Sequence, residues 1–139
     1  IAPNNDPGSA AIFATLDTLP KDRFRVLPSM RFAHFSELMK NAACMVGNSS
    51  AGVREAPFLG LPSLDIGPRQ TNRSDPPSVT ACEAADRQTI LRFLQTDWGR
   101  QSTPHDGFGQ GTAAERFVQI LAQPDFWSLS LQKAFRDHV

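Results

Sequence analysis

Hydrophobic residues along the chain fall into two alternating patterns. Short, mostly apolar runs at 1–3, 24–27, 43–46, 62–66 and 78–82 predict buried strands. Between or beyond these runs, apolar residues recur at helical spacing. Their positions are Ile12, Phe13, Leu16 and Leu19; Phe32, Phe35, Leu38 and Met39; Ile90, Leu91 and Leu94; and Phe117, Ile120 and Leu121. Strands that alternate with helices indicate an α/β fold with a parallel sheet, and a Rossmann-like, doubly wound topology is its simplest form.

The chain after position 95 departs from this alternation. Residues 96–112 are rich in glycine and polar side chains, which is typical of a surface loop, although some loops of this length carry function. Thr112 is placed to cap the next helix. A last helix, at about 124–137, has an aromatic face that includes Trp127 and Phe135. That face either packs in the core or contacts a partner domain, because large aromatic side chains are favoured at interfaces.

A turn of small polar residues, 47–52, lies between a predicted strand and a predicted short helix, Val53 to Leu59. Such a turn directs free backbone N–H groups and the positive end of a helix at one place, which favours an anion. The hydroxyls of Ser49 and Ser50 add donors, and the Glu55 carboxylate could accept hydrogen bonds from a sugar diol. The alternative interpretation is an ordinary helix capped by serine or asparagine.

A second polar segment, 67–73, follows the predicted strand at 62–66. It contains Arg69 and Arg73, whose planar guanidinium groups can give paired hydrogen bonds to phosphate oxygens. Because the carboxyl ends of parallel strands meet at one edge of a sheet, we expect both arginines to reach the same edge as Ser49. The alternative is that both are solvated loop charges, but two anion-binding features on one edge argue against this for at least one arginine.

The composition excludes several classes of function. Lys plus Arg and Asp plus Glu each number 14 among 139 residues, so the formal net charge is zero and no nucleic-acid-binding surface is indicated. No apolar run is long enough to span a membrane. Cys44 and Cys82 lie in predicted strands without a CxxC pair, and the three histidines are scattered. We therefore expect free thiols, no metal site and a cytoplasmic protein.

Segments 47–57 (GNSSAGVREAP) and 67–73 (GPRQTNR) together resemble the signature of the UDP-N-acetylglucosamine 2-epimerases. Further segments resemble that family in the same order along the chain: 3–9, 28–32, 108–111 and 132–135. The resemblance is closer to the hydrolysing branch of the family, which serves sialic acid and related nonulosonic acid pathways.

The resemblance implies a glycosyltransferase-B-like fold, in which two Rossmann-like domains face each other across a cleft. Residues 1–139 match only the C-terminal, UDP-binding domain, and they start at what should be its second strand. We therefore expect a single, partial domain that lacks its first, central strand. We also expect the last helix, about 124–137, to pack toward an N-terminal domain that is absent from these residues.

The resemblance also assigns substrate-binding roles. Ser49 and Ser50, with the backbone of Ala51, would bind the β-phosphate of UDP. Glu55 would bind the ribose hydroxyls, and Arg69 would reach the phosphates or the sugar.

Two further motifs of the family fall in the N-terminal part. The backbone around Met30 would hydrogen-bond the uracil edge. Asn5 and Asp6 lie in a motif to which side-chain chemistry assigns no role, and we interpret Asp6 as a turn-forming helix cap.

The activity implied for the whole enzyme is conversion of UDP-N-acetylglucosamine and water to N-acetylmannosamine and UDP, by elimination followed by hydration. No convincing base stands out, so we expect catalytic residues mainly outside this chain, which alone would bind UDP without epimerising the sugar. The resemblance implies no cofactor and a homo-oligomer. The alternatives are an epimerase of another UDP-sugar, such as UDP-diacetamido-trideoxyglucose, a glycosyltransferase of the same architecture, and a non-catalytic UDP-sugar-binding module.

Overall fold

The computed structural model describes residues 1–128 and 130–132. At its centre is a parallel sheet of three strands in the order β1-β2-β3: β1 (Met45–Gly47), β2 (Ser63–Ile66) and β3 (Val79–Cys82). The register pairs Gly47 with Asp65, and Asp65 in turn with Ala81. The predicted α/β class with a parallel sheet is therefore confirmed, although the sheet has fewer strands than the apolar runs predict.

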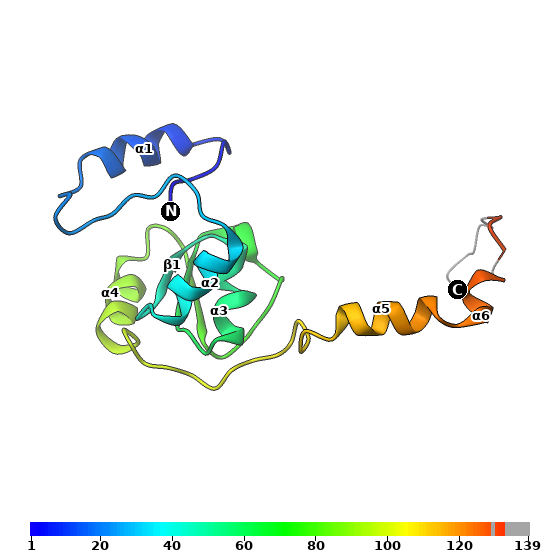
Figure 1. The fold of residues 1–139 in the computed structure, drawn as a ribbon. Helices are drawn as coiled ribbons and strands as arrows, with labels where there is room; N and C mark the ends of the chain where they lie inside the picture. Colours follow the sequence, from blue (N-terminus) through cyan, green and yellow to red (C-terminus); the bar gives the residue numbers. More distant parts are fainter. Residues whose placement is uncertain (129, 133–139) are drawn as a thin grey trace, which may run out of the picture.

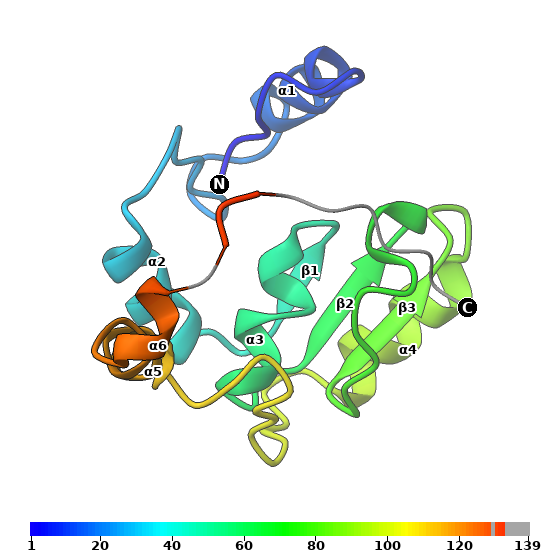
Figure 2. The same ribbon diagram turned by 90° about the vertical axis from the view of Figure 1, so that its right-hand side faces the viewer.

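Helices cover both faces of this sheet. The α-helices are α1 (Ser9–Asp17), α2 (Phe32–Lys40), α3 (Glu55–Phe58), α4 (Arg87–Thr96), α5 (Ala113–Leu121) and α6 (Pro124–Trp127), and the 3-10 helices are η1 (Ser50–Gly52) and η2 (Pro68–Gln70). Figure 1 shows α4 on one side of the sheet and α2 with α3 on the other, and Figure 2 shows the same arrangement from the α3 side. This two-sided cover is the layering of a doubly wound domain.

The core lies against the middle of the sheet. Met39, Ala51, Ala56 and Leu61 form a buried cluster that joins α2, η1 and α3. The side chain of Leu64, on the middle strand, is fully buried. On α2 this cluster buries Met39 and partly covers Phe35, whereas Phe32 and Leu38 stay exposed. Such burial is the main stabilising contribution available to so short a helix.

Helix α4 buries a residue that is not among the apolar positions used to predict it. Phe93 is its buried residue, at 1% exposure, whereas Leu91 and Leu94 are exposed. The helix predicted from the spacing of Ile90, Leu91 and Leu94 is confirmed. Its buried face is narrow because α4 contacts β3, which is an edge strand.

Local side-chain chemistry sets some of the helix ends. Asp86 caps α4 because its carboxylate accepts a hydrogen bond from the Thr89 N–H at 3.0 Å, and this bond lowers the pKa of Asp86. Thr112 occupies the N-cap position of α5, as predicted, but its side chain makes no capping hydrogen bond.

The predicted strands at 1–3 and 24–27 do not join the sheet. They lie beside each other, linked by a hydrogen bond from the Ala2 N–H to the Leu27 carbonyl at 2.7 Å. In the predicted strand order another strand would separate them from β1, and the described residues supply none for that place. Two short extended segments alone form too few ladder bonds to count as strands.

The segment after α4 confirms the predicted irregular loop, yet it is tied to the body of the protein. The Ser102 N–H donates to the Gly60 carbonyl at 2.8 Å, and the His105 N–H donates to the Pro57 carbonyl at 2.9 Å. These two bonds hold the loop against the end of α3.

Helices α5 and α6 form an arm that extends away from the sheet (Figure 1). The Trp127 indole N–H donates to the Leu121 carbonyl at 2.8 Å and so fixes α6 on α5. Neither helix has a buried residue. The interpretation that the aromatic face packs in the core is therefore wrong for the residues that the structure describes. The predicted helix at 124–137 is helical only over Pro124–Trp127, and residues 129 and 133–139 lie outside the described residues. Packing of this tail on another domain stays a prediction.

No helix among residues 1–128 and 130–132 is long and apolar enough to cross a membrane.

Candidate functional site

The polar turn after β1 is the first part of the candidate site. Ser49 precedes η1, and its side-chain oxygen accepts a hydrogen bond from the Ala51 N–H at 3.3 Å. The Gly52 N–H donates to the Ser49 carbonyl at 3.0 Å and closes the turn. The turn thus follows a strand and opens a helical segment at the carboxyl edge of the sheet, as the sequence predicts.

The helix after this turn begins later than predicted. Val53 is not helical, and the four-residue α3 starts at Glu55 instead of Val53. Pro57 explains the difference, because it has no N–H to donate to the Val53 carbonyl and is tolerated only in a first turn. So short a helix has a weak dipole, so hydroxyl groups and individual amides are the main anion donors here.

A buried glutamine joins the polar turn to the next loop. Gln70 ends η2 after β2, is 3% exposed, and donates its Nε2 hydrogen to the Asn48 carbonyl at 2.8 Å. Asn48 directly precedes Ser49. The two loops that the sequence places on one sheet edge are therefore in direct contact.

Arg69 lies in η2 and points toward the N-terminal part of the chain. Its Nη2 atom is 3.2 Å from Oδ2 of Asp6. Arg73 is exposed and forms no ion pair within the part of the chain that the structure describes. The structure thus places one of the two predicted arginines in a specific contact and leaves the other solvated.

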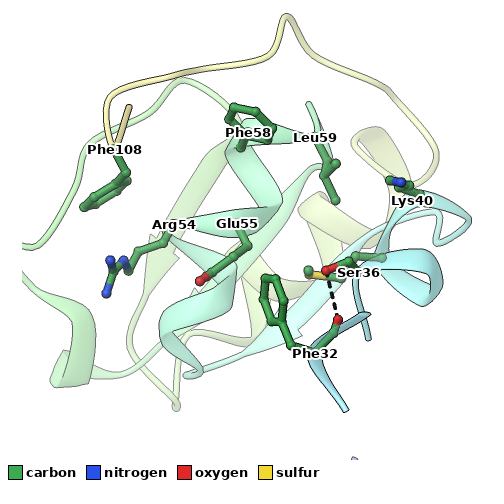
Figure 3. A pocket seen from close by; sticks show the side chains of 9 residues that line it. Phe32, Ser36, Lys40, Arg54, Glu55, Phe58, Leu59 and Phe108 are labelled. Atoms are coloured by element: carbon green, nitrogen blue, oxygen red, sulfur yellow. Dashed lines mark hydrogen bonds between the residues drawn. The ribbon is translucent and has the colours of Figure 1, made fainter. Parts of the chain in front are cut away.

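A groove of about 320 Å³ runs between α2 and α3. Figure 3 shows the Glu55 side chain between those of Arg54 and Phe32, with Phe58 on α3 and Phe108 on the loop after α4. The Arg54 guanidinium lies 4.9 Å from the centroid of the Phe108 ring, a cation–π distance. The groove is mostly apolar, so it suits the flat face of a base or sugar better than a phosphate.

Glu55 has spare hydrogen-bonding capacity in this groove. Its Oε2 atom is buried and has no hydrogen-bond partner among the described residues. A buried carboxylate oxygen without a donor is costly, so a ligand hydroxyl at this place would satisfy it.

Met30 is less closely connected to the rest of the site. It is half-buried in the segment before α2 and close in sequence to Phe32, which lines the groove. The structure gives no hydrogen bond between Met30 and the polar turn in the described part of the chain. The predicted uracil contact therefore stays a prediction.

The middle strand contributes buried polar groups that the sequence pattern did not single out. Asp65 is 5% exposed, and burial raises the pKa of its carboxyl. Residues 1–128 and 130–132 contain no cluster of three or more His, Cys, Asp or Glu side chains that could hold a metal ion.

Sequence reasoning missed Gln70 and Phe108 as parts of this region. Gln70 follows Arg69 in a polar loop, and nothing in the periodicity distinguishes a buried glutamine from a solvated one. Phe108 lies in a glycine-rich loop. An isolated aromatic residue in such a loop is the one sequence feature that could have indicated a packed side chain.

The position of Gly52 gives a test of how tightly the turn packs. A Cβ atom at this residue would lie 2.8 Å from the Ser63 Oγ atom, and the backbone there is otherwise compatible with alanine. We expect Gly52→Ala to destabilise the fold by about 1–3 kcal/mol, the usual cost of overpacking. The free energy of unfolding from urea titration measures this.

The matched variant is Ser63→Ala, because the Ser63 hydroxyl is buried without a hydrogen-bond partner in the described residues. Alone it should change stability by less than about 1 kcal/mol, and in the double variant it should remove most of the cost of Gly52→Ala. Additive effects of the two substitutions would contradict the packing described for this turn.

Comparisons with known proteins identify the family of this chain. The family model of UDP-N-acetylglucosamine 2-epimerase matches residues 1–122. The chain is 39% identical to a UDP-N-acetylglucosamine 2-epimerase of Neisseria meningitidis over 140 residues, which is 99% of this chain and 37% of the relative. It is 25% identical to a UDP-N,N'-diacetylbacillosamine 2-epimerase (hydrolyzing) of Legionella pneumophila, over 96% of this chain and 36% of the relative. A GDP/UDP-N,N'-diacetylbacillosamine 2-epimerase (hydrolyzing) of Campylobacter jejuni is 34% identical over 49% of the chain and 18% of its own length. Nearly all of this chain is matched by the relatives from N. meningitidis and L. pneumophila, but it spans little more than a third of their length. The chain belongs to the UDP-N-acetylglucosamine 2-epimerase family.

Proposed function

We propose that this chain forms the UDP-binding part of a hydrolysing UDP-N-acetylglucosamine 2-epimerase. The observation that carries the proposal is the direct contact between the loops that follow β1 and β2. The hydrogen bond from Gln70 to Asn48 brings the serine turn and the Arg69 loop together at one edge of a parallel sheet. In this proposal the hydroxyl, amide and guanidinium donors of these two loops bind the diphosphate.

In the proposed reaction, a base removes the proton at C2 of the sugar while the bond from C1 to the diphosphate oxygen breaks. The electron pair of that bond leaves with UDP, and a 2-acetamidoglucal remains. Water then adds across the double bond and gives free N-acetylmannosamine. Negative charge grows on the diphosphate in the first step, and donors fixed in advance stabilise it without reorganisation.

Two groups of residues bind different parts of the nucleotide in this proposal. Ser49, Ser50 and the backbone of Ala51 hold the β-phosphate, with Arg69 approaching from the neighbouring loop. Glu55 accepts hydrogen bonds from the ribose at the mouth of the apolar groove, and the backbone near Met30 receives the uracil. The base at C2 comes from outside these residues, and no cofactor takes part in the scheme.

A second candidate is hydrolysis and epimerisation of a diacetamido sugar nucleotide. Two relatives carry names of this kind, those of L. pneumophila and C. jejuni. The relative from N. meningitidis is named for UDP-N-acetylglucosamine and shares the higher identity, which favours that substrate. The nucleotide part of the site would serve both sugars equally.

Product analysis distinguishes these candidates. The complete gene product that contains these residues, incubated with UDP-N-acetylglucosamine, should release free N-acetylmannosamine and UDP in equal amounts, followed by proton NMR. Formation of UDP-N-acetylmannosamine without free sugar would rule out the hydrolysing reaction. Turnover of the diacetamido nucleotide alone would favour the second candidate.

The serine turn can be tested through UDP binding. In the complete gene product, Ser49→Ala combined with Ser50→Ala should weaken UDP binding by about tenfold or more, because two hydrogen bonds to a charged group are lost. Isothermal calorimetry measures the affinity. The control is Ser128→Ala, an exposed serine of the distant arm whose hydroxyl donates to the Asp125 carbonyl. Equal affinity of the double variant and the control would exclude the turn from the site.

The role of Glu55 can be tested by changing the ribose. Glu55→Gln should weaken UDP binding by about five- to tenfold, since a charged acceptor is replaced by a neutral amide. The affinity for 2′,3′-dideoxyuridine diphosphate, measured in the same way, should be unchanged. Glu115→Gln, at the exposed start of α5, is the matched control. An equal loss for both nucleotides would point to a structural effect instead of a ribose contact.

A further inference from the structure

We propose that Asp6 is a positioning residue for Arg69, holding its guanidinium where the diphosphate binds. The inference rests on the proposed UDP-binding function. The ion pair between Arg69 Nη2 and Asp6 Oδ2, at 3.2 Å, carries it. The other ion pairs of residues 1–128 and 130–132 join neighbours in sequence, Asp22 with Arg23 and Glu37 with Lys40. The pair at Asp6 is the one that ties two distant loops together.

The turn that presents Asp6 has a defined backbone. The Asp6 carbonyl accepts a hydrogen bond from the Ser9 N–H at 3.1 Å, and Gly8 at φ 91° takes the left-handed conformation that the turn requires. The N-cap residue of α1 is Gly8, with no side-chain capping bond. Our interpretation of Asp6 as a helix cap is therefore wrong. Its backbone shapes the turn, and its carboxylate is free to contact Arg69.

The backbone on the other side of the pair is fixed as well. Arg69 lies between Pro68 and Gln70, and the buried Gln70 is hydrogen-bonded to the serine turn. The side chain of Arg69 is half exposed and would otherwise sample many rotamers. Asp6 contacts one terminal nitrogen, so the remaining N–H groups of the guanidinium stay available for an anion.

Two physical effects of Asp6 oppose each other at this site. Its negative charge repels a diphosphate, and this effect alone predicts tighter binding once the carboxylate is removed. Its contact with Arg69 restricts the guanidinium in advance, and loss of this contact predicts weaker binding. Because both side chains of the pair are half exposed, solvent and salt screen the repulsion between the Asp6 carboxylate and the diphosphate. The orientation of the Arg69 guanidinium, in contrast, depends on its direct contact with Asp6. Orientation should therefore dominate.

The test compares variants of the complete gene product in calorimetric titrations with UDP and with uridine, which lacks the diphosphate. Asp6→Ala should weaken UDP binding by about three- to tenfold and leave uridine binding unchanged, because one charged donor is misplaced but not removed. Asp6→Glu, which restores the carboxylate, should recover most of the affinity. In an Arg69→Ala background, Asp6→Ala should have no further effect on UDP binding.

The matched control is Asp22→Ala, which removes an exposed carboxylate beside Arg23 and should leave both affinities unchanged. Unchanged or tighter UDP binding by Asp6→Ala would overturn the positioning role. An equal loss for uridine, or a loss that persists without Arg69, would overturn it too, since the effect would then be general. Failure of the wild-type protein to bind UDP would instead refute the proposed function, and the positioning role with it.

Discussion

The hydrogen bond between the Gln70 amide and the Asn48 carbonyl is the contact on which the candidate site depends. Parallel pairing of Gly47 with Asp65 brings the ends of β1 and β2 level, but pairing alone does not fix the loops beyond them. Gln70 is buried, so leaving its Nε2 group unpaired would carry a large desolvation cost. This cost keeps the two loops in one arrangement and thereby sets the spacing between the serine turn and Arg69.

The sequence was informative wherever a short range of residues decides the structure. The predicted strands at 43–46, 62–66 and 78–82 correspond to β1, β2 and β3, because each apolar run ends at a turn. The placement of Ser49 and Arg69 on one edge followed from parallel topology. The predicted helix Val53 to Leu59 starts too early, because Pro57 has no N–H to donate to the Val53 carbonyl. Gln70 and the partner of Arg69 could not be predicted, since both contacts join segments far apart in the chain.

The N-terminal segments show how a strand prediction depends on a neighbour. Residues 1–3 and 24–27 have the composition of strands and lie beside each other, yet one hydrogen bond between them does not make a ladder. In a doubly wound sheet the strands of one half meet those of the other through a central strand. β1 has no partner on its outer side among the described residues, and Val46 on it is 48% exposed. Strand propensity therefore identified segments that are extended, but whether they join the sheet depends on a neighbouring strand with which they can form hydrogen bonds.

Part of the exposed apolar surface lies on α5, in the arm that extends away from the sheet. α5 is strongly amphipathic, but Phe117 and Val118 are 62% and 63% exposed on an arm that contacts little of the sheet. Helical periodicity predicts that such a face is covered, because an isolated helix of this length gains most of its stability from packing. The outer edge of β1 also favours a covering segment, because its backbone N–H and C=O groups have no strand partner among the described residues. Both surfaces would be satisfied by further polypeptide packed against this chain. The proposed division of roles is consistent with that need, because it assigns the nucleotide donors to this chain and the base at C2 to residues outside it.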